Sequence, residues 1–511
     1  MKPLCSPSVV ACLLALLQGV VSANEIDRLV LQKLDADGMS CSPRCSDEVF
    51  VRRVYLDMIG TVPRIYEVRA FLASENPRKR AQLIEKLFAR EEFGDYWGMK
   101  WCDILRVKAE FPSKLWPNAV QAYQRWLTDA VRDNMPYDQF AHALLTASGS
   151  NFRDPPVNFY RAMPERKPAA LATTVALTFM GERADKWPKA RRDGMTAFFT
   201  RLGYKGTAEW KEEVLFFDLP RALEEGAPKG AVFPDGTPVK LSADQDPRDV
   251  FAEWLTTPDN PYFARNIVNR IWAWLIGRGI IHEPDDIRPG NPPSHPELLR
   301  WLETDLVTHN YDLRHIYRLI LNSETYQRSC EHNESNAADE RGFSHYLVRR
   351  LEAEVLIDAI NQITGSTESY TSEIPEPFTF IPPRHRAITL GDGSITSPFL
   401  DMFGRPPRDT GMESERNNDP TDTQRLHLLN STHVQLKIQR SRVLRELPKR
   451  VKWRPAAVID LFYLALLSRH PSEAERKTAL AYGASGVVKK HEAYQDLAWA
   501  LLNSKEFLYR H

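Results

Sequence analysis

The densest group of side chains able to do chemistry lies in IIHEPDDIRPGNPPSHPELL, residues 280–299. Two adjacent carboxylates, Asp285 and Asp286, precede Arg288 and, further on, His295. Carboxylates near a histidine can bind a divalent metal or act as an acid and a base. Both carboxylates can equally pair with nearby arginines and only shape the loop. The segment therefore predicts either a ligand or metal site or a structural polar loop.

Two residues at the end of this segment favour a structural role. Ser294 and Glu297 have the Ser-x-x-Glu spacing of a capping box, in which each side chain accepts a hydrogen bond from the other residue's backbone. An apolar, helix-periodic stretch follows them directly. We therefore expect Ser294 to cap a helix.

A second polar segment spans residues 403–430, FGRPPRDTGMESERNNDPTDTQRLHLLN. It carries Arg405, Arg408, Glu415 and Arg416 in a stretch with little periodicity. Long polar loops often line binding clefts, although a surface loop laced with ion pairs has the same composition.

If the chain has a ligand site in these segments, we expect the site to lie between the two loops. Asp286 and Arg416 should then face one cleft, about 10 Å wide, that holds a sugar or a peptide. If the side chains point to opposite faces, the site does not exist.

Motifs of the common enzyme classes are missing from the sequence. It contains no phosphate-binding loop, dinucleotide fingerprint, His-Glu-x-x-His or Gly-x-Ser-x-Gly. Cys41 and Cys45, in CSPRC, could form a disulfide or remain two free thiols. Covalent haem at this pair is disfavoured, because Ser46 rather than a histidine follows Cys45. Whether the protein is an enzyme stays open.

The overall composition is that of a soluble globular protein of 511 residues, 43% of them hydrophobic. Lys plus Arg equals Asp plus Glu, at 67 each, so no global field attracts nucleic acid. Residues 1–23 resemble a secretory signal peptide, with an early lysine, an apolar run and small residues before the cleavage point. We expect an exported protein, periplasmic or secreted, with no membrane span after signal cleavage.

The elements that must position these loops are mainly helices. Apolar residues recur at helical spacing through most of the chain, and Ser46 suits the N-cap of a helix that begins at Asp47. A strand is expected at residues 212–218, one within 375–394, and a hairpin turn at Asp235-Gly236.

The predicted organisation is a signal peptide and two helical domains. The N-terminal domain spans residues 24–219 and the C-terminal domain residues 247–511. A linker with the β-hairpin, residues 220–246, joins them.

Several long motifs resemble a known family. Residues 48–72, EVFVRRVYLDMIGTVPRIYEVRAFL, resemble the start of the second planctomycete cytochrome domain, a domain of unknown function. Residues 260–302, with LVRRLEAEVLIDAI and the closing LLNSKEFLY, resemble the domain of unknown function that usually follows it. Many members are exported by planctomycetes and are c-type cytochromes or carry cytochrome domains. The resemblance implies no settled activity.

One segment departs from this family. Many relatives have a Cys-x-x-Cys-His haem motif after a helix that ends in aromatic-x-Gly, followed by a Trp and an Ala-Phe-Phe segment. Here Phe179 and Gly181 match the helix end, Trp187 the Trp, and residues 197–199 the last part, but the haem motif is absent. A c-type haem needs two thiols and a histidine. We therefore expect no haem cofactor.

Two functions follow from these observations. The first is an exported, haem-free binding or accessory protein that acts on another exported protein or on a carbohydrate or peptide ligand. The alternative is an exported hydrolase-like or metal-dependent enzyme that uses Asp285, Asp286 and His295. An electron-transfer protein that borrows haem from a partner is disfavoured by the missing motif.

Overall fold

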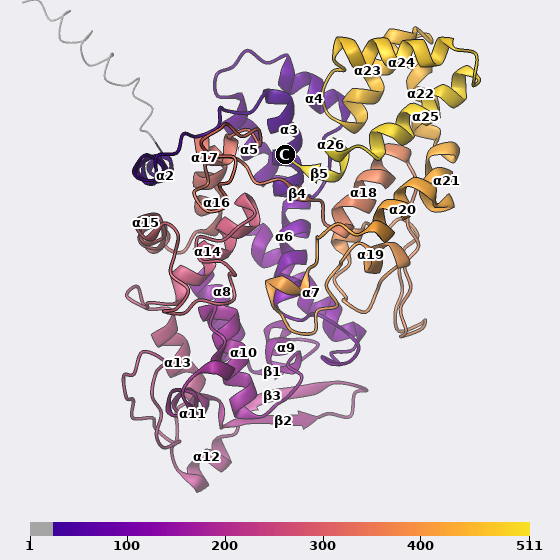
Figure 1. Ribbon diagram of the computed structural model, residues 1–511. Coiled ribbons are helices and arrows are strands. Elements are labelled where there is room, and N and C mark those ends of the chain that lie inside the picture. Colours follow the sequence, from indigo (N-terminus) through magenta and orange to yellow (C-terminus); the bar gives the residue numbers. More distant parts are fainter. Residues whose placement is uncertain (1–23) are drawn as a thin grey trace, which may run out of the picture.

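The computed structural model describes residues 24–511 (Figure 1), so the predicted signal peptide, residues 1–23, lies outside the described range. As predicted, the described chain is mainly α, with one three-stranded and one two-stranded antiparallel sheet. None of its helices is both long enough and apolar enough to cross a membrane.

Before the predicted linker the helices are α2 (Glu25–Ala36), α3 (Asp47–Ile59), α4 (Ile65–Leu72), α5 (Lys79–Phe88), α6 (Glu91–Ile104), α7 (Pro117–Arg132), α8 (Tyr137–Thr146), α9 (Asn158–Arg161), α10 (Pro168–Met180) and α11 (Lys189–Thr196). The linker region itself begins with a short helix, α12 (Leu219–Glu225). After it they are α13 (Pro247–Leu255), α14 (Phe263–Ile276), α15 (Pro296–Thr308), α16 (Leu313–Asn322), α17 (Glu324–Gln327), α18 (Ala353–Thr364), α19 (Pro398–Met402), α20 (Asp422–Asn430), α21 (Thr432–Arg440), α22 (Arg442–Arg450), α23 (Pro455–Leu466), α24 (Glu473–Ala484), α25 (Lys490–Leu502) and α26 (Lys505–Leu508). The strands are β1 (Gly149–Ser150), β2 (Leu202–Gly206), β3 (Glu213–Phe217), β4 (Arg349–Arg350) and β5 (Tyr509–Arg510).

The β-hairpin of the protein is β2–β3, which lies before the predicted linker. Its strands pair antiparallel, with Tyr204 opposite Leu215, and β1 extends the sheet on the other side of β3. The strand expected at residues 212–218 is therefore present. At Asp235 the expected turn forms, but only one bridge, Val232 to Pro238, flanks it. A proline has no N–H to donate to a strand ladder, so longer strands cannot form there.

Residues 375–394 contain no strand, contrary to the expectation. This region carries only a short 3-10 turn, Ala387–Thr389, and the single bridge nearby joins Thr371 to Thr396. Buried Asp358 instead satisfies part of its backbone, because it accepts hydrogen bonds from the N–H groups of Ala387 and Ile388. Backbone groups paired in this way need no neighbouring strand.

Helix α3, in the upper part of the view in Figure 1, contacts the C-terminal end of the chain. Ser46 Oγ accepts a hydrogen bond from Val49 N, as expected for its N-cap. Two buried arginines of α3 donate to backbone oxygens far along the sequence: Arg52 to those of Leu466 and Phe507, and Arg53 to that of His511, among others. Strand β5, at the C-terminus, pairs with β4 beside α3 (Figure 1). The buried apolar side chains of both predicted domains form one cluster.

Candidate functional site

The two polar loops predicted from the sequence meet through one buried carboxylate. Asp285 is 1% exposed, and its Oδ1 pairs with Arg270 of α14. Its Oδ2 accepts a hydrogen bond from the backbone N–H of Glu413, in the second loop, at 2.6 Å. Both oxygens therefore have internal partners, so Asp285 fastens the loops together.

The same loop packs against the end of α10 and the residues that follow it. Ile287 N donates to the carbonyl of Gly181, at the end of α10, over 2.9 Å. Gly181 has a φ of 67°, and a Cβ there would lie 2.8 Å from Asn266 Oδ1 and from Ile287 Cδ1. Arg183, two residues later, donates to the carbonyl of Asp285. In this chain the segment is thus packed tightly against the first polar loop.

The arginines of the second loop point into the protein and pair with carboxylates there. Arg416 donates to both oxygens of Glu354, at 2.7 and 3.1 Å, and to Asp103 at 2.6 Å. Arg408 donates to Asp103 at 2.8 Å, and Arg405 lies 3.5 Å from Glu354. Each of the three arginine side chains is at most 5% exposed. We call these five residues the arginine cluster.

The arginine cluster holds Asp103 in the charged form. Burial raises the pKa of the Asp103 carboxyl, but Arg416 and Arg408 outweigh burial and leave that pKa below its usual value. A carboxylate with a lowered pKa beside two guanidinium groups is a poor acid or base at neutral pH. The cluster is therefore suited to structure rather than to proton transfer.

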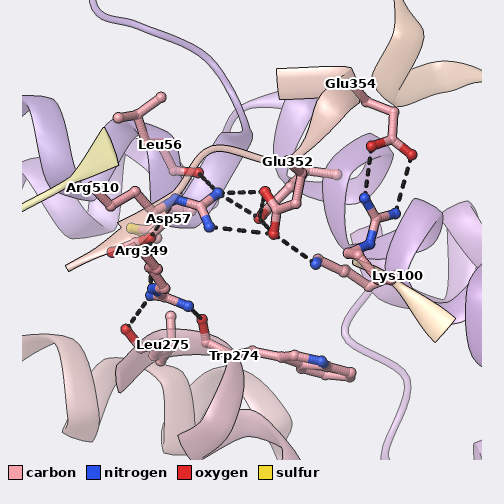
Figure 2. A network of polar contacts seen from close by, with 12 residues as sticks. Leu56, Asp57, Lys100, Trp274, Leu275, Arg349, Glu352, Glu354 and Arg510 are labelled. Carbon is pink, nitrogen blue, oxygen red and sulfur yellow. Dashed lines mark hydrogen bonds and ion pairs between the residues drawn. The ribbon is translucent and has the colours of Figure 1, made fainter. Parts of the chain in front are cut away.

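A second buried network continues from the arginine cluster toward the C-terminus (Figure 2). Glu352 pairs with Arg510 at 2.6 Å and with Lys100 at 2.7 Å, and Asp57 pairs with Arg510 at 3.1 Å and with Arg349 at 3.3 Å. Burial opposes ionisation of Glu352, but Arg510 and Lys100 lower its pKa well below the usual value. These ion pairs tie α3, α6 and the two strands β4 and β5 to one another.

The remaining candidate residues of the first loop form no hydrogen bond or ion pair with those of the second loop. Asp286 pairs with Arg288, whose side chain is 54% exposed, so this pair is on the surface. Glu415 accepts hydrogen bonds from the backbone of Asp409 and Thr410 and closes its own loop. Asp286 and the buried Arg416 thus have different partners and do not contact each other.

His295 lies in a small polar cleft of about 320 Å³, which neither Asp285 nor Asp286 lines. It is 3% exposed, its ring packs 4.9 Å from the ring of Phe343, and burial lowers its pKa to about 4. The histidine is therefore neutral at physiological pH.

The capping-box prediction at Ser294 was wrong. Helix α15 begins at Pro296, and His295 occupies the N-cap position without a side-chain cap bond. Ser294 instead stays in the loop, because its N–H donates to the carbonyl of Ile280 and its hydroxyl bonds to Nδ1 of His295.

The four cysteines among residues 24–511 are free thiols, including Cys41 and Cys45. The polar loops contribute to no group of side chains with metal-ligand spacing. The one such group among the described residues, Asp305, His309 and His315, lies elsewhere.

Two adjoining clefts that the sequence analysis did not predict share Arg64, Asn361, Gln362 and Gly365. Their volumes are about 890 and 700 Å³. We call them together the arginine groove. Helices α4, α18, α22 and α23 all contribute lining residues. In Figure 1, α4, α22 and α23 are labelled in the upper part of the view and α18 lies below them.

Seven arginines and three carboxylates line the arginine groove. The arginines are Arg64, Arg69, Arg90, Arg384, Arg386, Arg442 and Arg450, and the carboxylates are Glu67, Glu92 and Asp358. Arg90 lies within 4.0 Å of Glu67 and Glu92. Arg386 lies within 4.0 Å of Glu92 and Asp358. The guanidinium groups of the other five arginines form no ion pair with a carboxylate among the described residues, although the backbone N–H of Arg64 donates to Glu67. They come from three segments, residues 64–69, residue 384 and residues 442–450, which only folding brings together.

Comparison with protein families gives two matches. The family model PSCyt2, a protein of unknown function (DUF1549), matches residues 25–195, and PSD1, a protein of unknown function (DUF1553), matches residues 247–482. No curated protein and no solved structure matches the chain. The arginine groove is lined by residues from both matched segments.

Proposed function

We propose that this chain, which belongs to the family in which a DUF1549 domain is followed by a DUF1553 domain, is an exported, haem-free binding protein. Its ligand is an acidic segment of another exported protein, and its binding site is the arginine groove. Neither family description names an activity, so the argument rests on the groove itself.

The observation that carries the proposal is the surplus of arginine in a concave site. Arg64, Arg384 and Arg442 line the polar cleft without a carboxylate partner, in a chain whose formal net charge is zero. Local excess charge in a cleft focuses the field and attracts ligands of opposite sign. Guanidinium groups bind carboxylates in a bidentate geometry, so these arginines suit Asp and Glu side chains.

Arg386 adds a donor that lacks a partner. Its Nη2 is buried and has no hydrogen-bond partner among residues 24–511, while its Nε lies 3.6 Å from Asp358. A buried donor without a partner costs free energy, typically 1–3 kcal/mol. A ligand oxygen that reaches Arg386 would recover this cost on binding.

The second cleft favours a peptide over a polysaccharide. It is lined by Ile65, Ile363, Val443 and Leu447, with Tyr66 beside them. Tyr66 is 65% exposed and Val443 is 39% exposed. Aliphatic surface accepts the apolar side chains of a peptide, whereas sugars need many polar partners. A peptide in which acidic residues are followed by apolar residues would match both clefts.

The arrangement of the polar loops argues against the enzyme alternative. Arg270 and Glu413 N occupy both oxygens of Asp285, and Asp286 pairs with Arg288 at the surface. His295 faces a different cleft. An acid–base or metal site needs these groups within reach of one reacting atom.

Fluorescence anisotropy tests the proposed ligand class. A labelled peptide with a run of Glu followed by Leu should bind to the purified protein, and the same peptide with Gln in place of Glu should not. Binding should weaken as salt rises, because charge screening acts on exposed arginines. The proposal fails if the Gln peptide binds equally well, or if a sulfated polysaccharide binds and the acidic peptide does not.

A further inference from the structure

A corner between two helices gathers three side chains that metals prefer. Asp305 and His309 are four residues apart at the end of α15, so they share one face of the helix. His315 lies in the first turn of α16, beyond a short turn. One ligand atom from each of the three lies within 4.8 Å of the others.

The turn that carries these residues is held in place by the rest of the protein. Asn310 and Tyr311 both have positive φ, 53° and 57°, which reverses the chain within a few residues. Tyr311 is 6% exposed, and its carbonyl accepts a hydrogen bond from the N–H of Tyr137. Asp312 accepts from the N–H of His315 and caps α16. The positions of the two histidines are therefore set before any ligand arrives.

The distances suit a small divalent ion. His315 Nε2 lies 2.7 Å from Asp305 Oδ2, and His309 Nδ1 lies 3.5 Å from Asp305 Oδ1. Ligand atoms bound to tetrahedral Zn²⁺ at 2.0–2.2 Å lie roughly 3.3 Å apart. Only small side-chain movements are needed to reach this separation.

The side chain that must move most is also the freest. The two imidazole rings are stacked, with centroids 3.7 Å apart, and stacked rings do not aim their nitrogens at one point. The side chain of His309 is 46% exposed, so its ring can turn toward Asp305 and His315 once Nδ1 gives up its 2.9 Å hydrogen bond with the backbone carbonyl of Asp305. The ion would replace the hydrogen bond that now joins His315 to Asp305.

We propose that Asp305, His309 and His315 form a Zn²⁺ site that fastens α15 to α16. Two imidazoles and one carboxylate are a donor set that Zn²⁺ accepts, and solvent supplies the fourth ligand at this surface position. The site is independent of the arginine groove, because it shares no residue with it.

Isothermal titration calorimetry with Zn²⁺ tests the site, using full-length mature protein from which any affinity tag has been removed. The unaltered protein should bind one Zn²⁺ per chain, and Zn²⁺ should raise its melting temperature. Co²⁺ in the same site should give the visible absorption of four-coordinate cobalt. The variants His309→Ala and Asp305→Asn should lose more affinity than the roughly 10–100-fold that loss of an outer-shell partner costs.

The matched control is His142→Ala, which removes another exposed histidine and leaves the three ligands intact. It should bind Zn²⁺ like the unaltered protein. His309 is half exposed, so its replacement should not prevent folding. The proposal is overturned if the unaltered protein does not bind Zn²⁺, or if His309→Ala and Asp305→Asn bind it as tightly as the control.

Discussion

Replacement of Arg416 by alanine separates a structural from a ligand-binding role for the arginine cluster. The guanidinium of Arg416 makes three charge-assisted hydrogen bonds, two to Glu354 and one to Asp103. The side chains of Arg416 and Glu354 are 5% and 0% exposed, so water does not replace the lost bonds. In Arg416→Ala, Glu354 keeps only Arg405, at 3.5 Å, as an ion-pair partner.

The size of the effect follows from this burial. Removal of one partner from a buried ion pair typically destabilises a protein by about 3–5 kcal/mol. We expect Arg416→Ala to lie in that range. The control Arg288→Ala breaks the exposed pair with Asp286 and should cost at most about 1 kcal/mol.

Urea unfolding, followed by circular dichroism, measures both variants against the unaltered protein. The midpoint of Arg416→Ala should fall well below that of Arg288→Ala. Equal midpoints for the two variants would refute the structural role of the arginine cluster. In that case Arg416 would again be a candidate for ligand binding.

Three further predictions follow from individual residues. Because the folded-state pKa of His295, about 4, is depressed below its ordinary value of 6.5, the unfolded chain takes up a proton first. Stability should therefore fall by about 3 kcal/mol as pH drops from 6.5 to 4, and His295→Gln should flatten this dependence in urea titrations. Gly404 has a φ of 85° and its Cβ would lie 1.7 Å from Asn417 O, so Gly404→Ala should lower the melting temperature. Gly483→Ala, in α24 with open space around it, should instead stabilise by about 0.5–1 kcal/mol, and equal melting temperatures for the two would contradict this packing. Co-expression with a cytochrome c maturation system should give a protein without haem peroxidase staining, and a stained band would contradict the haem-free proposal.

Local signals in the sequence predicted the helices well. Ser46 caps α3 as expected. Leu-Asn-Ser also ends one helix and begins the next at α16–α17 and α25–α26, where Ser323 and Ser504 accept cap hydrogen bonds, whereas Ser431 at α20–α21 makes no side-chain cap bond. Such signals depend on residues a few positions apart, so no knowledge of the tertiary fold is needed.

The sites could not be predicted in the same way. The partners of Arg416, Asp103 and Glu354, are 313 and 62 residues away in the sequence. The sequence of a loop with many charges of both signs does not show whether its arginines face solvent or pair with buried carboxylates. The predicted hairpin strands at Asp235 are absent for a local reason, because Pro238 has no N–H to donate to a strand ladder.

The arginine groove could not be predicted from the sequence either. Arg64, Arg384 and Arg442 come from three segments, and nothing in their spacing indicates that they share a cleft. The triad of Asp305, His309 and His315 is partly visible in the sequence, because Asp-x-x-x-His at helical spacing precedes a further histidine.

The most direct test of the proposed function compares two double charge reversals for binding of the acidic peptide. Arg384→Glu with Arg442→Glu alters the arginine groove, whereas Arg125→Glu with Arg300→Glu alters two exposed arginines outside it. All four side chains are without a carboxylate partner among the described residues, so both variants should fold and carry the same net charge. We expect the groove variant to bind the peptide at least roughly tenfold more weakly than the control, because it places like charges opposite the ligand. Equal affinities for the two variants would show that the arginine groove is not the binding site.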